Sequence, residues 1–399
     1  MSKPKIRFKG YEEDWEQRKL KNEAEFGKGN GYSKSDLTEF GTPIILYGRL
    51  YTKYENLISD VDTFVNTKDG SVYSEGGEVI VPASGETAID IARAATVEKA
   101  GILLGGDLNI IKPNNNIDSK FLSLSISNGN SQRELAKKAQ GKSVVHIHNK
   151  EIQDLIIPFP CIEEQKNISK YFFKLDRLIT LHQRKCEETK KLKKYMLQKM
   201  FPQNRKRVPE IRFAGFTDDW EQRKLSKVAK YRNGKAHENS IAENGKYIVV
   251  NSKFVSTDGR VRKFSNEQIE PLYKGEIAFV LSDVPNGRAI ARTFLVDKDG
   301  KYTLNQRIAG ITPYENTDSY FLHILMNRNR YFLKFDDGNK QTNLSVNDVT
   351  NFEEKYPSYE EQYKIGQCFS NLDHLITLHQ RKYEELQKIK KFMLQNMFI

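Results

Sequence analysis

The chain has 399 residues, enough for two or three domains of ordinary size that each bury a core. Its 64 lysines and arginines outnumber its 52 aspartates and glutamates, and the net charge of +12 makes a polyanion such as nucleic acid the first partner to consider. Cys161, Cys186 and Cys368 lack CxxC spacing, which excludes a disulfide scaffold, and no apolar run is long enough to cross a bilayer; we therefore expect free thiols in a cytoplasmic protein.

A sequence near the start of the chain is repeated in its middle. PKIRFKGYEEDWEQRKL spans 4–20 and PEIRFAGFTDDWEQRKL spans 209–225, and each copy contains one of the two tryptophans, Trp15 and Trp220. We call these two segments the frames. They contain no nucleophile–base pair, so we interpret each frame as a strand and cap that anchor a domain to a helix junction rather than as a catalytic element.

A second repeat, 163–201 and 360–398, predicts two long helices of about 55 Å, since an α-helix rises 1.5 Å per residue. Apolar and a few polar residues recur with the 3.5-residue spacing of a coiled-coil seam. The predicted seam is Ile168, Phe172, Leu175, Ile179, His182, Cys186 and Thr189 in the first copy, and Ile365, Phe369, Leu372, Ile376, His379, Tyr383 and Leu386 in the second. His182 and His379 have no second ligand at i+3 or i+4, so we interpret them as buried polar residues that set the register, not as metal ligands. An ordinary amphipathic pair and a partner-binding surface are both compatible with this pattern.

The repeats divide the chain into two similar modules. The first is a domain of 1–162, with frame 4–20 and variable segment 21–162, followed by helix 163–201. The second is a domain of 202–359, with frame 209–225 and variable segment 226–359, followed by helix 360–399. The variable segments show little resemblance to each other. We expect an α+β protein in which two mixed α/β domains are separated by two long helices that form an antiparallel coiled coil, related by a pseudo-two-fold internal repeat.

Few motifs in the chain suggest a catalytic or metal-binding site. There is no GxxxxGK[ST] loop for ATP and no NPP[YF] tetrapeptide of an aminomethyltransferase. His146 and His148 lie on one face of a predicted strand, without a third ligand at metal-site spacing. A nuclease-type cluster of Asp60, Asp62 and Lys68 is left open. We expect no catalytic residue, no bound metal and no cofactor in this chain.

The variable segments instead contain Gly-rich turns with interleaved aromatic, basic, amide and hydroxyl side chains, which suit DNA. Arginine can bind guanine and Asn or Gln can bind adenine through two hydrogen bonds, while Lys suits phosphates. In the last loop, Gln341 and Asn343 suit adenine and Lys340 a phosphate; Arg307 suits either guanine or a buried structural pairing. The DNA-binding candidates are Lys28, Tyr32, Ser33, Lys34, Tyr47, Arg49, Tyr51, Lys53, Ser84, Glu86, Thr87, Gln140, Lys142, Ser143, His146, His148, Arg232, Lys235, His237, Asn251, Lys253, Asn286, Arg288, Asn305, Gln306, Arg307, Lys340, Gln341 and Asn343.

The whole layout resembles the specificity (S) subunit of bacterial type I restriction-modification systems. The duplicated frames and helices carry the resemblance, and PASGETAIDIA, GGDLNI, ITLHQRK and LNQRI look like stretches of staphylococcal and related Gram-positive members. The resemblance implies that each variable domain recognises half of a split duplex DNA target. It also implies that the helices set the spacer and hold two methyltransferase subunits, and that motor-nuclease (restriction) subunits join the complex.

The same resemblance implies that S-adenosylmethionine, and ATP with Mg²⁺ for restriction, are used by the assembled complex and not by this chain. Two alternatives remain. A self-contained enzyme would need a methylase tetrapeptide or a nuclease domain, for which the repeats leave no room. A coiled-coil scaffold with two protein-binding end domains would differ from an S subunit in not binding duplex DNA.

Overall fold

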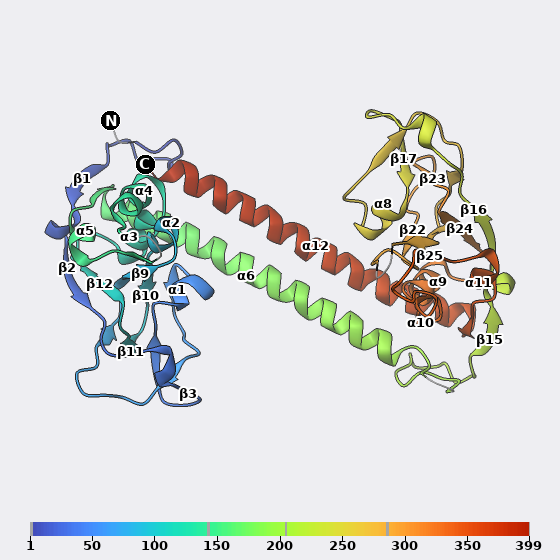
Figure 1. The fold of residues 1–399 in the computed structure, drawn as a ribbon, viewed down its shortest axis with the longest axis horizontal. Coiled ribbons are helices and arrows are strands. Elements are labelled where there is room, and N and C mark those ends of the chain that lie inside the picture. The colour runs from blue at the N-terminus through green and yellow to red at the C-terminus, as the bar shows by residue number, and fades with distance from the viewer. Residues whose placement is uncertain (1–2, 142–143, 204–205, 285–286, 399) are drawn as a thin grey trace. The chain divides into compact units, whose positions relative to one another are not determined.

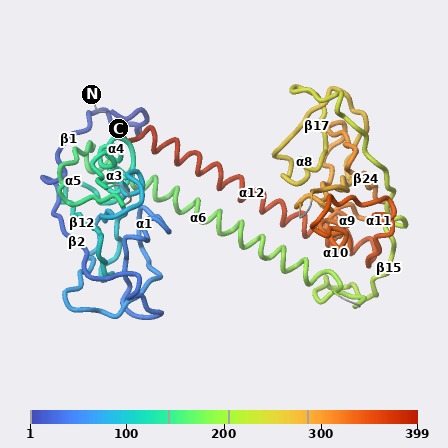
Figure 2. Tube along the Cα trace, viewed as in Figure 1, coloured from blue at the N-terminus to red at the C-terminus, as the bar shows by residue number. Residues whose placement is uncertain are grey.

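The computed structural model describes residues 3–141, 144–203, 206–284 and 287–398. The chain forms two compact units: unit 1 comprises Met1–Arg184 and Gln380–Ile399, and unit 2 comprises Lys185–His379. Both ends of the chain therefore belong to unit 1 (Figure 2). Each unit combines one domain with parts of both long helices, so neither unit contains a complete long helix.

The domain in unit 1 is built on two five-stranded mixed sheets. The first sheet has the order β2 (Ala24–Lys28), β12 (Leu108–Pro113), β8 (Val79–Pro82), β10 (Ala95–Val97) and β5 (Leu57–Ile58), and the second β3 (Leu37–Thr38), β6 (Phe64–Val65), β4 (Thr42–Ile45), β11 (Ala100–Leu104) and β7 (Tyr73–Glu75). Two-stranded pairs are β1 (Glu16–Lys19) with β14 (Ile156–Phe159), and β9 (Ser84–Gly85) with β13 (Val145–His146). The helices are α1 (Arg49–Thr52), α2 (Ala88–Ile91), α3 (Ser119–Ile126), α4 (Gly129–Lys138) and α5 (Asn149–Gln153).

The domain in unit 2 repeats this plan with four-stranded sheets. Their orders are β16 (Ala229–Asn233), β24 (Ile308–Pro313), β20 (Ile277–Val280) and β22 (Thr293–Leu295), and β18 (Lys263–Ser265), β17 (Tyr247–Val250), β23 (Tyr302–Leu304) and β19 (Pro271–Leu272). The two-stranded pairs are β15 (Glu221–Lys224) with β26 (Glu353–Tyr356), and β21 (Ser282–Asp283) with β25 (Thr342–Asn343). The helices are α7 (Leu225–Val228), α8 (Ser252–Ser256), α9 (Ser319–Met326), α10 (Arg330–Leu333) and α11 (Val346–Thr350).

A fully buried central strand separates two hydrophobic clusters in each domain. Side chains alternate between the faces of a strand, so Val79 and Val81 of β8 face the core that contains α3, whereas Ile80 faces the core toward the second sheet. In β20, Ile277 and Phe279 likewise face the core that contains α9, whereas Ala278 and Val280 face the core toward the second sheet. Each central sheet is therefore covered on one face by helices and on the other by a second sheet.

The two variable segments share a fold, so our expectation of little resemblance was incomplete. IKPNNNIDSKFL (111–122) and ITPYENTDSYFL (311–322) form β12–α3 and β24–α9 respectively. Asp118 and Asp318 cap the two helices by accepting hydrogen bonds from the backbone N–H groups of Phe121 and Phe321, at 2.8 and 2.7 Å. This shared phrase is visible in the sequence and was overlooked because the surrounding loops differ.

The frames clamp the chain where it enters each long helix, which confirms their structural interpretation. The repeated EQRK forms β1 and β15, which pair with β14 and β26 just before the helices, whereas the IRF residues form no strand. Trp15 and Trp220 are buried and pack edge-to-face against Phe121 and Phe321.

A bidentate ion pair fastens each frame to the helix that follows. The guanidinium of Arg7 donates two hydrogen bonds of 2.7 Å to the Glu164 carboxylate. Arg212 makes the same two bonds, also of 2.7 Å, to Glu361. The DWEQRKL repeat and the arginine before it thus form the same junction between domain and long helix in both copies.

The long helices are α6 (Ile162–Lys199) and α12 (Tyr359–Met397) (Figure 1). In unit 1, Phe172 packs against Phe398 and Asp176 pairs with Lys390. In unit 2, Lys193 pairs with Asp373 at 2.6 Å and Phe201 packs against Phe369. Residue numbers rise along one helix as they fall along the other, so the helices run antiparallel within each unit.

The described seam residues are all buried or half-buried, including His182 and His379. However, Ile168, Phe172 and Leu175 belong to the core of the first domain, and Ile365, Phe369 and Leu372 to that of the second. A 3.5-residue spacing shows which face of a helix is covered, but it does not distinguish a partner helix from a domain. The start of each predicted seam is therefore a domain anchor.

His323 on α9 makes unit 2 sensitive to acid. Burial, together with the positive charge of Lys193, lowers the pKa of His323 to about 4. Because the unfolded chain takes up this proton near pH 6.5, we expect unit 2 to lose on the order of 3 kcal/mol as pH falls from 6.5 to 4. Urea denaturation followed by Trp220 fluorescence in a Trp15→Phe background measures this loss, and His323→Leu should remove it. Unit 1 has Ser123 at the equivalent position, so the Trp15 signal in a Trp220→Phe background is the matched control; an equal loss there would contradict the assignment.

No helix in the described part of the chain is both long and apolar enough to span a membrane. No disulfide joins Cys161, Cys186 or Cys368.

Candidate nucleic-acid interface

Each domain has a short ribbon of two strands at the same place in the fold. The first ribbon is β9 with β13, where Ser84 pairs with His146, and the second ribbon is β21 with β25, where Ser282 pairs with Asn343. Each ribbon begins directly after the buried central strand, β8 or β20. A loop side chain attached to such a strand is held more rigidly than one on an ordinary loop.

The same backbone hydrogen bonds hold both ribbons. In the first, Ala83 N–H donates to Asp107 C=O at 2.8 Å and Ile147 N–H donates to Ala83 C=O at 3.0 Å. In the second, Leu281 N–H donates to Arg307 C=O at 3.1 Å and Leu344 N–H donates to Leu281 C=O at 2.8 Å. Equivalent positions therefore carry Asp107 in one domain and Arg307 in the other.

The first ribbon presents His146 and gathers several predicted residues. His146 and His148 are exposed, and their rings stack at 6.4 Å with an interplanar angle of 7°. Exposed Gln140 exchanges backbone hydrogen bonds of 3.2 and 2.8 Å with His146. The start of α2 lies beside this ribbon and contributes exposed Glu86 and Thr87, whose hydroxyl caps the helix.

The second ribbon presents amides with cations around them. Gln341 and Asn343 are exposed, and Gln341 Nε2 donates to Ser282 Oγ at 2.8 Å. The Asp283 carboxylate accepts the N–H groups of Val284, Ala289 and Ile290, which folds the segment containing Arg288 back onto the ribbon.

Four cations lie on segments that contact or belong to the second ribbon. Arg307 is exposed in the turn between β23 and β24, so the alternative of a buried pairing for it was wrong. Ser252 Oγ donates to Ser282 C=O at 3.4 Å and brings Lys253 close to the ribbon. Lys253, Arg288, Arg307 and Lys340 are all exposed, a charge pattern that suits phosphates or base edges.

Three candidates of the first domain are internal instead, so their prediction as DNA contacts was wrong. Tyr32 is buried and its hydroxyl lies 2.6 Å from Ser71 Oγ. Arg49 is buried and pairs with Glu55 and Asp62, each at 2.8 Å. Tyr51 donates its hydroxyl proton to Ser84 C=O at 2.7 Å, and burial raises its pKa. The Tyr32 and Tyr51 hydroxyls and both terminal nitrogens of Arg49 thus already have partners within the domain.

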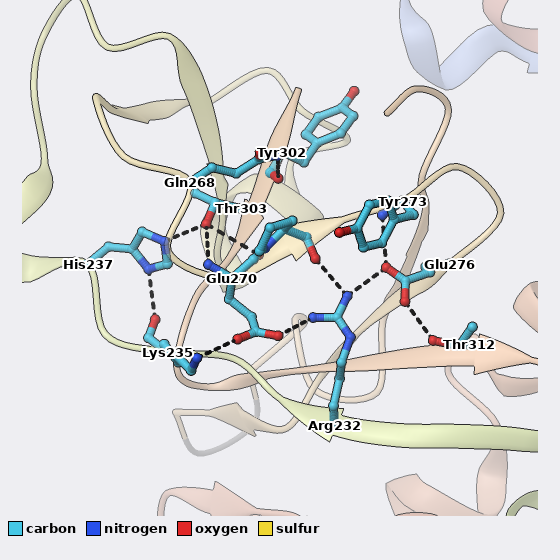
Figure 3. Close-up of polar contacts among 11 residues, drawn as sticks. Arg232, Lys235, His237, Gln268, Glu270, Tyr273, Glu276, Tyr302, Thr303 and Thr312 are labelled. Carbon is cyan, nitrogen blue, oxygen red and sulfur yellow. Dashed lines mark hydrogen bonds and ion pairs between the residues drawn. The ribbon is translucent and has the colours of Figure 1, made fainter. Parts of the chain in front are cut away.

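Two candidates of the second domain belong to an internal polar network, shown in Figure 3, and their prediction was also wrong. Arg232 pairs with Glu270 and Glu276, at 2.5 and 2.6 Å. His237 is 2 % exposed, and its ring nitrogens lie 2.7 Å from Lys235 C=O and 2.7 Å from Thr303 Oγ1. Lys235 is exposed but pairs with Glu270 at 3.1 Å.

Of the other DNA-binding candidates, some are exposed on the surface and others take part in internal contacts. Lys28, Ser33, Lys34, Tyr47 and Lys53 are exposed, although Lys53 pairs with Asp62 at 2.9 Å. Asn251 caps α8, Asn305 is half-buried, and Gln306 donates to Glu238 at 3.1 Å. Ser84 is a buried residue of the first ribbon. Lys142, Ser143 and Asn286 lie outside the described residues.

The nuclease-type cluster left open above is dispersed. Asp62 pairs with Arg49 and Lys53, Asp60 pairs with Lys99, and Lys68 pairs with Asp36. Among the described residues, no group of three or more His, Cys, Asp or Glu side chains is placed to hold a metal ion. The ribbons, by contrast, present hydrogen-bonding side chains on rigid supports.

Sequence comparison assigns the chain to a family. The family model of the type I restriction modification DNA specificity domain matches twice, at residues 12–191 and 217–388. The chain belongs to this family. Each match contains part of one frame, one ribbon and most of one long helix, so the chain is a type I restriction-modification specificity subunit with two recognition domains.

Relatives of the specificity subunit agree in sequence and fold. The MjaVIII specificity subunit of Methanocaldococcus jannaschii is 27 % identical over 310 residues, covering 73 % of this chain and 72 % of the relative. A putative MjaX specificity subunit of the same organism is 23 % identical over 401 residues, covering 95 % and 91 %. The crystal structure of the type I S subunit from M. genitalium has the same fold, with a TM-score of 0.67, 16 % identity and coverage of 100 % and 99 %.

The structure also reveals a residue in this specificity subunit that sequence reasoning missed. Ser282 lies under Gln341 but was not among the candidates, although Ser84 was. The signal was present, since Ser84 and Ser282 each follow a buried apolar strand, VIVP (79–82) and IAFV (277–280), at the same distance. Aligning these strands would have identified the second serine.

Proposed function

We propose that each recognition domain reads one half of an asymmetric, bipartite duplex DNA target through its ribbon. The observation that carries this proposal is that the two ribbons have the same pattern of backbone hydrogen bonds but present different side chains. These are His146 in the first ribbon and Gln341 and Asn343 in the second. A common support with different hydrogen-bonding groups is what two readers of different sequences require. The net charge of +12 adds attraction to the phosphates.

We further propose that α6 and α12 set the spacer and bind two methyltransferase subunits. Leu192 and Tyr195 on α6 are both 49 % exposed, and Ile389 and Phe392 on α12 are 36 % and 55 % exposed. These pairs occupy equivalent positions in the repeated helix sequence. Two similar apolar pairs, each an aliphatic and an aromatic residue, suit two copies of one partner.

Catalysis, in this proposal, belongs to the partner subunits. The methyltransferase subunits would use S-adenosylmethionine, and restriction subunits ATP with Mg²⁺. The Asp60, Asp62 and Lys68 side chains each pair with other charged residues, which supports a chain that selects DNA without reacting with it.

Mapping methylated bases in the host genome, with and without this gene, tests the proposal. We expect two different half-sites that depend on the gene, about one helical turn or roughly 34 Å apart. A single continuous motif or a perfect palindrome would contradict two independent readers. Failure of the isolated chain to bind duplex DNA at low salt would favour the coiled-coil scaffold.

The last loop should separate sequence reading from general affinity. Gln341→Ala should cost about 1–3 kcal/mol on the cognate duplex and little on a scrambled one, because the amide contacts a base edge. Lys340→Ala should weaken binding to both duplexes equally and reduce the salt slope by about one, because an ammonium contacts a phosphate. Titrations at several salt concentrations, with methyltransferase subunits present, measure both effects. A change of sequence preference caused only by the lysine variant would reverse these roles.

A further inference from the structure

Each ribbon contains one buried serine at the same position. Ser84 is 9 % exposed and Ser282 is 5 % exposed, so neither side chain is available to a base. Each serine is nevertheless in contact with an exposed polar side chain: Ser84 Oγ lies 3.1 Å from His146 Nδ1, and Gln341 Nε2 donates to Ser282 Oγ at 2.8 Å. The serine is common to both domains, whereas the side chain that it supports differs.

The backbone of each serine is held as well. Tyr51 donates its hydroxyl proton to Ser84 C=O at 2.7 Å, and Ser252 donates to Ser282 C=O at 3.4 Å. The neighbouring residues, Ala83 and Leu281, make the paired ribbon hydrogen bonds described above. A hydroxyl on so constrained a backbone can orient the group that it contacts.

We propose that Ser84 and Ser282 are positioning residues that fix which hydrogen-bonding atoms His146 and Gln341 present to DNA. This inference rests on the proposed function of the ribbons. It assigns to the two serines a role different from the direct DNA contact first expected of Ser84.

In the second domain, the serine decides the orientation of an amide. Ser282 Oγ holds one hydrogen of Gln341 Nε2 and leaves Oε1 and the other N–H for a ligand. That acceptor–donor pair matches N6 and N7 of adenine. Without the serine, the amide can rotate by 180° about its terminal bond and exchange acceptor and donor.

In the first domain, the proposed role of the serine is to select one tautomer of the His146 imidazole. When the Ser84 hydroxyl donates to His146 Nδ1, a neutral ring carries its proton on Nε2. His146 then presents a donor, which matches acceptors such as guanine O6 or N7 and thymine O4. One structural device thus supports two different reading chemistries.

The test maps genomic methylation for the full chain in its host, comparing wild type with Ser282→Ala, Gln341→Ala and the double variant. Ser282→Ala should reduce discrimination by about ten-fold at one base pair, the same base pair that Gln341→Ala affects. The double variant should be no worse than Gln341→Ala, because the serine acts only through the glutamine. Ser84→Ala is the matched variant and should relax one base pair in the other half-site only.

Several outcomes would overturn the inference. These are an unchanged motif in Ser282→Ala, relaxation at a different base pair from Gln341→Ala, additive losses in the double variant, or no effect of Gln341→Ala. A wild-type map without two half-sites would instead refute the proposed function. Trp220 and Trp15 fluorescence report folding of units 2 and 1; if an alanine variant fails to fold, the cysteine variant, which keeps a side chain of similar size but bonds weakly, replaces it with the same expected result.

Discussion

Replacing Arg212 with alanine is expected to destabilise unit 2 by about 3–5 kcal/mol, because it leaves a buried carboxylate without its partner. The Glu361 side chain is 1 % exposed, and its carboxylate accepts two hydrogen bonds of 2.7 Å from the Arg212 guanidinium. Without Arg212, the negative charge of Glu361 would be buried with neither an ionic partner nor water to solvate it. The same substitution of Arg7 in unit 1 should have a similar effect, since the Glu164 side chain is 0 % exposed.

Urea denaturation followed by Trp220 fluorescence in a Trp15→Phe background measures the loss in unit 2. Arg223→Ala is the matched control: its partner Glu221 is exposed, and such pairs contribute about 0–1 kcal/mol. A second control, Arg212→Met with Glu361→Gln, removes both charges and should recover much of the stability. If Arg212→Ala and Arg223→Ala cost the same, the ion pair does not fasten the frame to α12.

A chain with two copies of the second variable segment is expected to recognise a symmetric target. The variant places 226–359 between residues 20 and 163, so that both domains carry the second ribbon. The junctions are the repeated EQRKL and EEQ sequences, which have the same structure in both copies. The new target should consist of the second half-site twice, inverted because α6 and α12 run antiparallel within each unit.

Methylation mapping again provides the measurement. Occupancy of the original target should fall by about 100-fold or more if the half-sites differ at two or more base pairs, at about 1–3 kcal/mol for each mismatch. The reverse variant, with 21–162 in both positions, should produce the complementary palindrome and is the matched control. A target that loses both half-sites in either variant would show that the domains do not read independently.

The duplication and the long helices could be predicted from sequence because their signals are local. DWEQRKL is identical in both copies, and the heptad spacing of residues such as Phe172 and Phe369 depends only on helix geometry. The domain fold was less accessible. Strands as short as β9 and β21 have no periodicity to detect, and their existence depends on partners far along the chain, His146 and Asn343.

Even within the helices, one residue needed the tertiary structure to explain it. Gly366 stands in the first turns of α12, where glycine weakens a helix. A Cβ at this position would lie 2.4 Å from Asp318 Oδ1. In the first copy, Ser169 instead donates to Asp118 Oδ1 at 2.7 Å. The glycine thus permits a close approach to the cap of α9 that nothing in its local sequence indicates.

Sequence alone determined that the chain is a duplicated, basic two-domain protein with a family resemblance now shown to be correct. It could not determine which polar side chains face DNA. Arg232 and Arg307 are both followed or preceded by amides and looked equally available, yet Arg232 pairs with Glu270 and Glu276, which lie 38 and 44 residues away, and Arg307 is exposed. Availability depends on whether folding brings an acceptor within about 3 Å, and a linear pattern does not contain that distance.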